Sequence, residues 1–331
     1  MSPQPLLTAD NLSVEFRTDA GVVSAVTDIS FEINPGEVLA VVGESGSGKS
    51  VTALALMRLH PKNTDITGSV VFDGVDVLAL TESEMRSIRG RDVAMIFQDP
   101  MTALNPVFTV GDQISEAIRV HTTASKRSAW DRAVDLLQMV GVPEPKQRAA
   151  QHPHEYSGGM RQRAMIAMAI CNDPKLLIAD EPTTALDVTV QAQVMEVLHE
   201  VQQATGSAMM LITHDLGLVA GSADRVQVMY ASRLMETGDL DAIFYDSRNP
   251  YTAALLDSIP DLEAVKTSLK AIPGNPPSLL NPPSGCAFRP RCSMAIEQCS
   301  ETEPAMVSLA HDHASRCHRT AELGAGAGVA S

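Results

Sequence analysis

The sequence predicts an α/β fold with a mainly parallel core sheet, an antiparallel β subdomain, an inserted helical subdomain and a C-terminal extension rich in proline and cysteine. Short apolar runs alternate with helical patterns, which is typical of a parallel sheet covered by helices on both faces. No strand-like run interrupts the residues from about 100 to 170, which therefore read as the helical insertion. Five prolines between residues 273 and 285 precede four of the five cysteines, so this end of the chain differs in composition from the rest.

Length and charge indicate the domain organisation and exclude some functions. A chain of 331 residues suits one large domain, expected over residues 1–245, with an extension over 246–318 and a disordered tail over 319–331. The net charge of −15 argues against contact with nucleic acid or an anionic lipid surface, because both are polyanions. The first residues lack the pattern of a signal peptide, and no run approaches the roughly 20 apolar residues of a spanning helix. We therefore expect a cytoplasmic protein that reaches a membrane only through a protein partner.

Patterns typical of β-strands occur in the first part of the sequence and again after residue 175. Residues 29–33 alternate apolar and polar, Pro35 and Gly36 make a turn, and the apolar run 38–42 predicts a buried strand. Three further short apolar runs predict strands of the same sheet: Leu176 to Ala179, Met209 to Thr213 and Val226 to Met229.

The region between the early and the late strands has a helical period. Its apolar residues recur at helical spacing, and Gly141 follows them as a signal that ends the helix. These apolar residues are Trp130, Ala133, Val134, Leu137 and Val140.

A phosphate-binding loop follows the strand that ends at Val42. Residues 43–50 read GESGSGKS and lead into a helix-forming run at 51–57, so the GxxxxGK[ST] pattern stands in the strand, loop and helix context that it requires. Glycines let backbone N–H groups and the helix N-terminus approach phosphate closely. We expect Lys49 to neutralise the β and γ phosphates of ATP and Ser50 to bind Mg²⁺. The expected nucleotide contacts in this phosphate loop are Gly43, Ser45, Gly46, Ser47, Gly48, Lys49 and Ser50.

Two acids end a later apolar strand. Residues 176–180 finish at Asp180 and are followed by Glu181, and a carboxylate at this edge of a parallel sheet lies beside the phosphate loop in such folds. We expect Asp180 to hold Mg²⁺ through water and Glu181 to polarise the attacking water. The two acids could instead cap the next turn, but the phosphate loop upstream favours the catalytic interpretation.

A second glycine motif lies about twenty residues before the acidic strand. Residues 156–163 read YSGGMRQR, in which Ser157, Gly158 and Gly159 open a helix and form another anion-binding N-terminus. One chain has no evident use for two phosphate-binding sites unless a second subunit supplies or takes one. The sequence therefore predicts a nucleotide hydrolase that works with a partner.

These motifs resemble those of the ABC ATPase family of P-loop NTPases, and the resemblance extends over roughly residues 6 to 245. The family signature LSGGQ stands here as YSGGM, with Tyr156 and Met160 as departures. In the family, two such domains face head to tail, and each ATP lies between the phosphate loop of one and the signature of the other. The resemblance implies a dimer, in which a second ABC ATPase subunit that is a paralogue is favoured over a second copy of this chain.

Further matches occur in the order that the family has. The resemblance implies that Phe16 stacks on adenine and that Gln98 senses the γ phosphate beside Mg²⁺. It implies that His214 contacts the γ phosphate. It also implies that residues 185–187, which end in Asp187, form a loop across the dimer interface.

Three phrases are similar to the oligopeptide and dipeptide importer branch of this family. They are QDPMTALNP at 98–106, NPYTAALLDSIP at 249–260 and PGNPPSLLNPPSGCAFRPRC at 273–292, the last two of which lie in the extension. The resemblance implies an ATPase that powers peptide import as a peripheral subunit at the cytoplasmic face of the inner membrane. The implied partners are two membrane-spanning permeases, through which an extracytoplasmic substrate-binding protein acts.

Other functions stay open on the sequence. Importers of nickel, glutathione and other small solutes share this branch. A soluble ABC ATPase of DNA repair or translation is disfavoured because there is one phosphate loop, no long heptad repeat and a net negative charge. A non-catalytic regulatory module is disfavoured because Glu181 and His214 are both present, and we expect them to act with Gln98 in hydrolysis.

Four cysteines in the extension predict a metal site. They are separated by five, six and seventeen residues, and four thiolates suit either structural Zn²⁺ or an iron–sulfur cluster. Paired CxxC knuckles are absent, so we favour a [4Fe–4S] cluster over Zn²⁺, and both over a metal-free segment. The expected ligands are Cys286, Cys292, Cys299 and Cys317.

The surroundings of these cysteines add two expectations. The extension is short and rich in proline, so we expect it to fold around the metal and to brace the motor against a neighbouring subunit. Loss of Cys292 would then loosen the extension, while a distant phosphate loop still binds ATP. Nearby histidines could replace a cysteine ligand, although exposed residues of a polar tail are the plainer interpretation: His311, His313 and His318.

Overall fold

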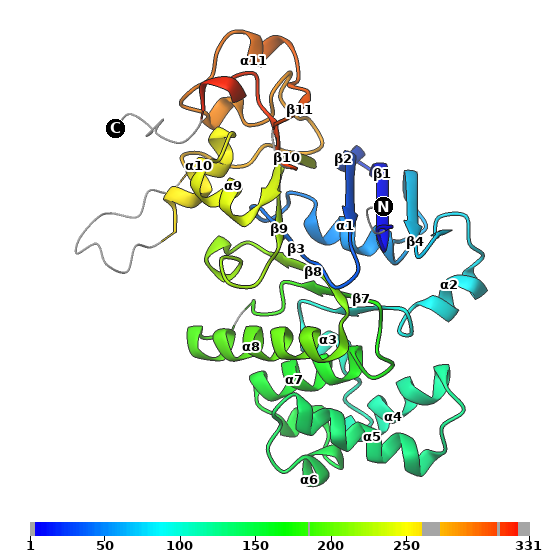
Figure 1. Cartoon of the computed structure of the whole chain (residues 1–331). Coiled ribbons are helices and arrows are strands. Elements are labelled where there is room, and N and C mark those ends of the chain that lie inside the picture. The colour runs from blue at the N-terminus through cyan, green and yellow to red at the C-terminus, as the bar shows by residue number, and fades with distance from the viewer. Residues whose placement is uncertain (1–3, 185, 260–271, 310–311, 324–331) are drawn as a thin grey trace. The chain divides into compact units, whose positions relative to one another are not determined.

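The computed structural model describes residues 4–184, 186–259, 272–309 and 312–323. Ala185, Pro260 and His311, which belong to the sequence motifs above, lie outside these ranges. The chain divides into two compact units: unit 1 has residues 1–7, 33–38 and 72–212, and unit 2 has residues 8–32, 39–71 and 213–331. Figure 1 labels helices and strands of both where there is room. No helix among the described residues is long and apolar enough to span a bilayer.

Three parallel strands form the sheet of unit 1. β6 (Val93–Ile96) pairs with β7 (Leu176–Asp180), and β7 pairs with β8 (Ala208–Thr213). Every residue of the three strands is buried, which is why they read as continuous apolar runs in the sequence. Since the strands are parallel and Ile96 lies opposite Ala179, the residues that follow β6 and β7 meet at one edge of this sheet.

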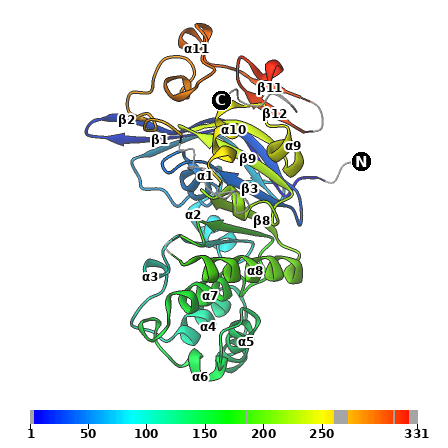
Figure 2. The ribbon, with the colours of Figure 1, turned by 90° about the vertical axis from the view of Figure 1, so that its left-hand side faces the viewer.

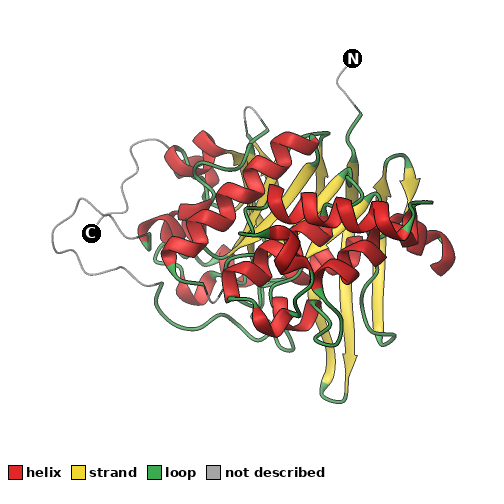
Figure 3. Cartoon of the chain, turned by 90° about the horizontal axis from the view of Figure 1, so that it is seen from below, coloured by secondary structure: helices red, strands yellow, loops and turns green. Residues whose placement is uncertain are grey.

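Helices fill the chain between β6 and β7, as the sequence predicts. α4, α5, α6 and α7 lie together in Figures 1 and 2, and Figure 3 colours helices red and strands yellow. In α5 (Lys126–Met139) Ala133, Val134 and Leu137 of the predicted stripe are buried, whereas Trp130 is only partly buried. Gly141 adopts the left-handed conformation that ends the helix. Unit 1 also contains β5 (Val75–Asp76), α2 (Glu82–Ile88), α3 (Pro100–Ala103), α4 (Val110–His121), α6 (Pro145–Ala149), η1 (Pro153–Glu155), α7 (Gly158–Ala169) and α8 (Val188–Thr205).

An antiparallel sheet begins the chain of unit 2. β1 (Leu7–Thr18) lies between β2 (Gly21–Ile33) and β4 (Thr64–Phe72). Only two residues connect β1 to β2, and so short a connection joins antiparallel neighbours. Along residues 29–33 buried and exposed side chains alternate, as the predicted strand requires.

A second group of paired strands in unit 2 carries the phosphate loop. β3 (Val38–Val42) pairs in parallel with β9 (Arg225–Tyr230), which pairs antiparallel with β10 (Arg233–Asp239). The extension adds two strands to the same sheet, because β12 (Ala314–Arg316) pairs with β10 and β11 (Met306–Ser308) pairs with β12. The predicted extension thus adds strands to the sheet that carries the phosphate loop.

The predicted tail begins later than the sequence indicates. Its first residues, 319–323, contain the turn η4 (Thr320–Glu322), and the carbonyl oxygen of Leu323 accepts a hydrogen bond from Arg248 Nη1 at 2.6 Å. This stretch therefore belongs to the folded extension, and residues 324–331 lie outside the described part. The remaining elements of unit 2 are α1 (Lys49–Leu56), η2 (Leu216–Leu218), α9 (Leu240–Tyr245), α10 (Pro250–Asp257), η3 (Arg289–Arg291) and α11 (Gln298–Glu301).

Candidate functional site

The phosphate loop connects the end of β3 to the start of α1. Gly43 and Gly48 have φ angles of 152° and 108°, which side-chain-bearing residues rarely adopt. A side chain at Gly43 would overlap the carbonyl oxygen of Met229, and one at Gly48 would press on the carbonyl oxygen of Ala25. Glycine at these two positions is what lets the loop lie this close to the surrounding backbone.

Two polar side chains of the phosphate loop are buried. Lys49 is 4% exposed, and its Nζ donates hydrogen bonds to the carbonyl oxygens of Gly43 at 2.7 Å and Glu44 at 2.9 Å. The Ser47 hydroxyl is buried and has no hydrogen-bond partner within the described residues. An ammonium group and an unpartnered hydroxyl at a helix N-terminus suit a bound phosphate.

Phe16 lies on β1 in the same unit as the phosphate loop. Its ring centroid is 5.5 Å from that of His60, with an angle of 76° between the rings. His60 Nε2 lies 3.0 Å from the carbonyl oxygen of Val51 in the first turn of α1. Burial lowers the pKa of His60, so its ring is neutral near pH 7 and packs as an aromatic group. Phe16 thus lies close to α1, the helix that follows the phosphate loop.

Gln98 and Thr184 contact Glu181 beside the acidic end of β7 in unit 1. Asp180 is the last residue of the strand and is buried, and Glu181 follows it with a φ of 45°. Gln98 Nε2 and Thr184 Oγ1 donate hydrogen bonds to Glu181 Oε2 at 2.9 and 2.8 Å. The structure therefore brings Gln98 and Glu181 together, since they follow neighbouring parallel strands. A non-glycine residue in the left-handed region, held by two donors, is a feature of functional sites.

The second glycine motif starts α7, also in unit 1. Ser157 is the N-cap, and its Oγ accepts a hydrogen bond from the N–H of Met160 at 3.3 Å. Ser157 and Gly158 are exposed, whereas Tyr156 is buried and donates to the carbonyl oxygen of Arg148 at 2.9 Å. Burial raises the pKa of Tyr156 to about 12, so this departure from the family signature is a neutral packing residue. The exposed helix N-terminus is a surface to which an anion can bind.

The other predicted contacts lie at the ends of two further elements. Asp187 is exposed and caps α8, where its Oδ1 accepts a hydrogen bond from the N–H of Val190 at 3.0 Å. His214 is exposed directly after β8. The predicted nucleotide contacts are divided between the units: unit 2 holds Phe16, the phosphate loop and His214, and unit 1 holds Gln98, Ser157, Gly158, Gly159, Asp180, Glu181 and Asp187.

The four cysteines of the extension line one small cavity. Its volume is about 20 Å³, and the N–H of Cys286 donates to the carbonyl oxygen of Cys299 at 2.9 Å. Burial raises the pKa of Cys317 to about 11 and raises that of Cys286 and Cys292, so these three thiols are protonated at neutral pH. The predicted metal site is not confirmed: among the described residues, which include all four cysteines, no three Cys, His, Asp or Glu side chains are placed to hold a metal ion.

The two described histidines of this region have other partners. His313 is buried, with Nε2 at 2.8 Å from Glu236 Oε1, so it is not the exposed tail residue that the sequence suggests. His318 Nε2 lies 3.0 Å from the carbonyl oxygen of Thr302. Neither histidine replaces a cysteine in the arrangement that the structure shows.

Sequence reasoning missed the side chains that hold Glu44 of the phosphate loop. They are Tyr251 and Arg291, which lie 207 and 247 residues further along the chain. No local pattern marks either residue as part of a nucleotide site. Only the phrases quoted for the extension, which contain both, pointed to this part of the chain.

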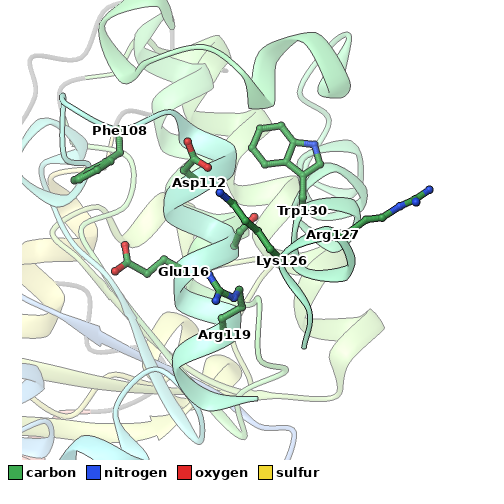
Figure 4. Close-up of a pocket in the computed structure, with 8 residues that line it drawn as sticks. Phe108, Asp112, Glu116, Arg119, Lys126, Arg127 and Trp130 are labelled. Carbon is green, nitrogen blue, oxygen red and sulfur yellow. The ribbon is translucent and has the colours of Figure 1, made fainter. Parts of the chain in front are cut away.

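A surface pocket lies between α4 and α5 of the helical insertion, with a volume of about 730 Å³. Figure 4 shows Phe108 and Trp130 at its sides, with Asp112, Glu116 and Arg119 on the α4 side. Aromatic rings bordered by charges of both signs suit a segment of a protein partner better than a nucleotide.

Comparisons with known proteins place these motifs in a family context. Residues 26–184 match the family described as ABC transporter, and residues 235–299 match the oligopeptide/dipeptide transporter, C-terminal region. The oligopeptide transport ATP-binding protein OppD of Haemophilus influenzae is 50% identical over 318 residues, which cover 96% of this chain and 98% of that protein. OppD of Bacillus subtilis is 51% identical over 311 residues, covering 93% of this chain and 87% of that protein.

Solved structures with the same fold include a dimeric ATP-binding cassette, MJ0796, in a post-hydrolysis state bound to ADP and Pi. It has a TM-score of 0.64 and 25% identity, and the match covers 71% of this chain and 98% of that chain. The fold predicted from the sequence is thereby confirmed.

Proposed function

This chain belongs to the ABC transporter family, and on that premise we propose that it is the ATP-hydrolysing subunit of an importer for oligopeptides or dipeptides. The observation that carries the proposal is the joint presence of an intact phosphate loop and the oligopeptide/dipeptide transporter C-terminal region in one chain. The oligopeptide transport ATP-binding proteins of Haemophilus influenzae and Bacillus subtilis match this chain over 98% and 87% of their own length.

ATP binding is the task of the phosphate loop. The N–H groups of the loop and the Lys49 ammonium group neutralise the phosphates, and Phe16 offers a ring on which adenine stacks. Ser50, Asp180 and Gln98 carry oxygen atoms of the kind that Mg²⁺ prefers, and they are the proposed ligand set. Bound there, Mg²⁺ would neutralise charge that develops on the β and γ phosphates.

Hydrolysis is the task of the acidic end of β7. The Glu181 carboxylate accepts a proton from the water that attacks the γ phosphorus, and ADP leaves with the electron pair of the broken P–O bond. Gln98 and Thr184 fix the plane of the carboxylate through their hydrogen bonds to Oε2. His214 contacts the γ phosphate in this proposal and stabilises its charge.

The exposed N-terminus of α7 needs a second motor subunit in order to act. We assign Ser157, Gly158 and Gly159 to the ATP of that partner, and the partner's signature to the ATP of this chain. The cassette bound to ADP and Pi is described as dimeric, which supports the arrangement. A paralogue is favoured as the partner. Asp187 would then lie at the interface between the two subunits.

Two membrane-spanning permeases would turn ATP hydrolysis into transport, with an extracytoplasmic binding protein delivering the peptide. The subunit would then lie at the cytoplasmic face of the inner membrane. The pocket beside Phe108 is the surface that we assign to a permease, because its exposed aromatic ring is bordered by charges of both signs. The change Phe108→Ser should reduce co-purification of permeases, whereas unchanged recovery would contradict the assignment.

The cysteine cavity completes the proposal. We assign Cys286, Cys292, Cys299 and Cys317 to one metal group, a [4Fe–4S] cluster before Zn²⁺, and the support is the convergence of four thiols on one cavity. A cavity of about 20 Å³ is too small for a cluster, so the thiols would have to move apart to hold one. Iron, sulfide and zinc analysis of anaerobically purified protein tests this. Finding none of them would overturn the metal assignment.

Peptide uptake tests the proposed function itself. The complex of this chain with its permeases and second motor subunit would be reconstituted in vesicles and supplied with labelled peptide and ATP. We expect uptake that requires ATP and is lost in the Glu181→Gln variant. ATP-dependent uptake of nickel or glutathione without uptake of any peptide would contradict the peptide assignment, and absence of ATP hydrolysis would contradict the motor assignment.

A further inference from the structure

An arginine of the extension binds the one acidic side chain of the phosphate loop. Arg291 Nη1 donates to Glu44 Oε2 at 2.6 Å, and Arg291 Nη2 donates to Glu44 Oε1 at 2.9 Å. The Arg291 side chain is 5% exposed and that of Glu44 is 24% exposed. A bidentate ion pair of this kind, largely shielded from water, orients the carboxylate of Glu44 and compensates its negative charge.

The same guanidinium group also donates hydrogen bonds to two other parts of the chain. Its Nε donates to the carbonyl oxygen of Pro273 at 2.9 Å, and Nη2 donates to that of Ile272 at 3.3 Å. Nη1 also donates to the Tyr230 hydroxyl at 3.3 Å, and the guanidinium carbon lies 5.7 Å from the centre of the Tyr230 ring. Arg291 therefore joins the proline-rich segment 272–285, here called the connector, to β9 and the phosphate loop through one side chain.

A tyrosine of α10 holds the backbone of the same loop residue. The N–H of Glu44 donates to the Tyr251 hydroxyl at 3.0 Å, and Tyr251 is fully buried against Tyr230 and Phe288. The carbonyl oxygen of Glu44 accepts the hydrogen bond from Lys49. The N–H and the carboxylate of Glu44 are thus both bound by residues that follow the predicted motor domain.

The charges in the loop show what the arginine contributes. The loop sequence GESGSGKS contains one acid, Glu44, and one base, Lys49, so the loop alone has a formal charge of zero. A carboxylate in a polyphosphate site repels the ligand, and it does so more strongly where water is partly excluded. Arg291 neutralises Glu44, so that the charge of Lys49 remains for the phosphates.

We propose that Arg291 is a charge-compensating and positioning residue of the ATP site, through which the C-terminal extension sets the affinity for nucleotide. The inference rests on the proposed ATP binding at the phosphate loop and does not depend on a metal at the cysteines. The competing explanation is that Arg291 merely fastens the connector through Ile272 and Pro273. The two explanations predict different effects on the Kd for ATP when the charge of Glu44 is removed from a chain that lacks Arg291.

Equilibrium binding of Mg·ATP to the full-length chain separates the two explanations. Arg291→Gln leaves Glu44 uncompensated, so we expect the Kd to rise about tenfold, with kcat changed far less than KM. Adding Glu44→Gln to that variant should bring the Kd back to within about threefold of the wild type, because the repelling charge is gone. A role confined to the connector predicts no such rescue.

Two further variants serve as controls. Arg289→Gln removes a guanidinium group from the same turn η3, where Arg289 Nη1 donates to the carbonyl oxygen of Ser284 at 2.9 Å, and it should leave the Kd unchanged. Glu44→Gln alone keeps the bonds of Arg291 to the connector and should bind ATP at least as tightly as the wild type. This variant keeps the test valid even if Arg291→Gln fails to fold.

The proposal is overturned if Arg291→Gln leaves the Kd within twofold of the wild type. It is also overturned if the double variant binds as weakly as Arg291→Gln, or if Glu44→Gln alone binds tenfold more weakly than the wild type. A wild-type chain that binds no ATP would instead contradict the proposed function, so the two failures are distinguishable.

Discussion

The carboxylate after β7 and the phosphate loop after β3 are held in place by different parts of the chain. Glu181 receives hydrogen bonds from Gln98 and Thr184, both of which belong to unit 1 and follow strands of its sheet. Glu44 is bound by Tyr251 and Arg291 of the C-terminal extension. On the proposed function, the position of the catalytic carboxylate is set by contacts within unit 1, whereas nucleotide affinity depends also on the extension.

The largest expected effect separates hydrolysis from binding. Glu181→Gln removes the proton acceptor, so we expect kcat to fall about 1000-fold while the Kd for ATP stays within about twofold. Steady-state phosphate release and equilibrium ATP binding measure the two quantities. Glu196→Gln, an exposed carboxylate change on α8, is the control and should leave both unchanged. Wild-type turnover in Glu181→Gln would place catalysis elsewhere.

The next effect concerns binding. Lys49→Ala removes a buried ammonium group from the phosphate loop, and we expect the Kd for ATP to rise about 100-fold. Lys62→Ala, an exposed change in the same unit, should bind ATP as the wild type does. Equal affinity in Lys49→Ala and the wild type would remove the phosphate-loop assignment.

The phosphate loop could be predicted because its geometry is local. Gly43 and Gly48 adopt φ angles that favour glycine, and the eight-residue motif records this requirement, whereas the backbone that they approach belongs to Met229 and Ala25 outside the motif. The meeting of Gln98 and Glu181 was implied by family resemblance, and the parallel register of β6 and β7 explains it. The alternation of strands and helices predicts a parallel sheet, whereas the order of its strands is seen only in the structure.

The extension could not be predicted to the same degree, because long-range contacts hold it. Asn249 Nδ2 donates to the carbonyl oxygen of Arg316, and Arg316 Nε donates to that of Leu234, each across more than 60 residues. Nothing in the spacing of the cysteines reveals that β12 pairs with β10 or that Arg291 reaches Glu44. From the sequence alone, the phosphate loop is expected to be distant from the extension. In the structure, Arg291 of the extension instead contacts Glu44 of that loop.

The smallest expected effect tests the link between the two regions most directly. Cys292 follows Arg291, and its N–H donates to the carbonyl oxygen of Arg289 at 3.2 Å, so a change here disturbs the turn that positions the arginine. We expect Cys292→Ser to make the extension more susceptible to protease. Ser308→Ala, an exposed change on β11, is the control and should do nothing.

The decisive measurement is the Kd for Mg·ATP of Cys292→Ser, compared with its kcat at saturating ATP. If the extension sets nucleotide affinity, the Kd should rise about threefold to fivefold while kcat stays at the wild-type value, because Glu181 is held within unit 1. A loosened extension with an unchanged Kd would contradict this account. The extension would then only brace the motor against a neighbouring subunit, as expected from the sequence.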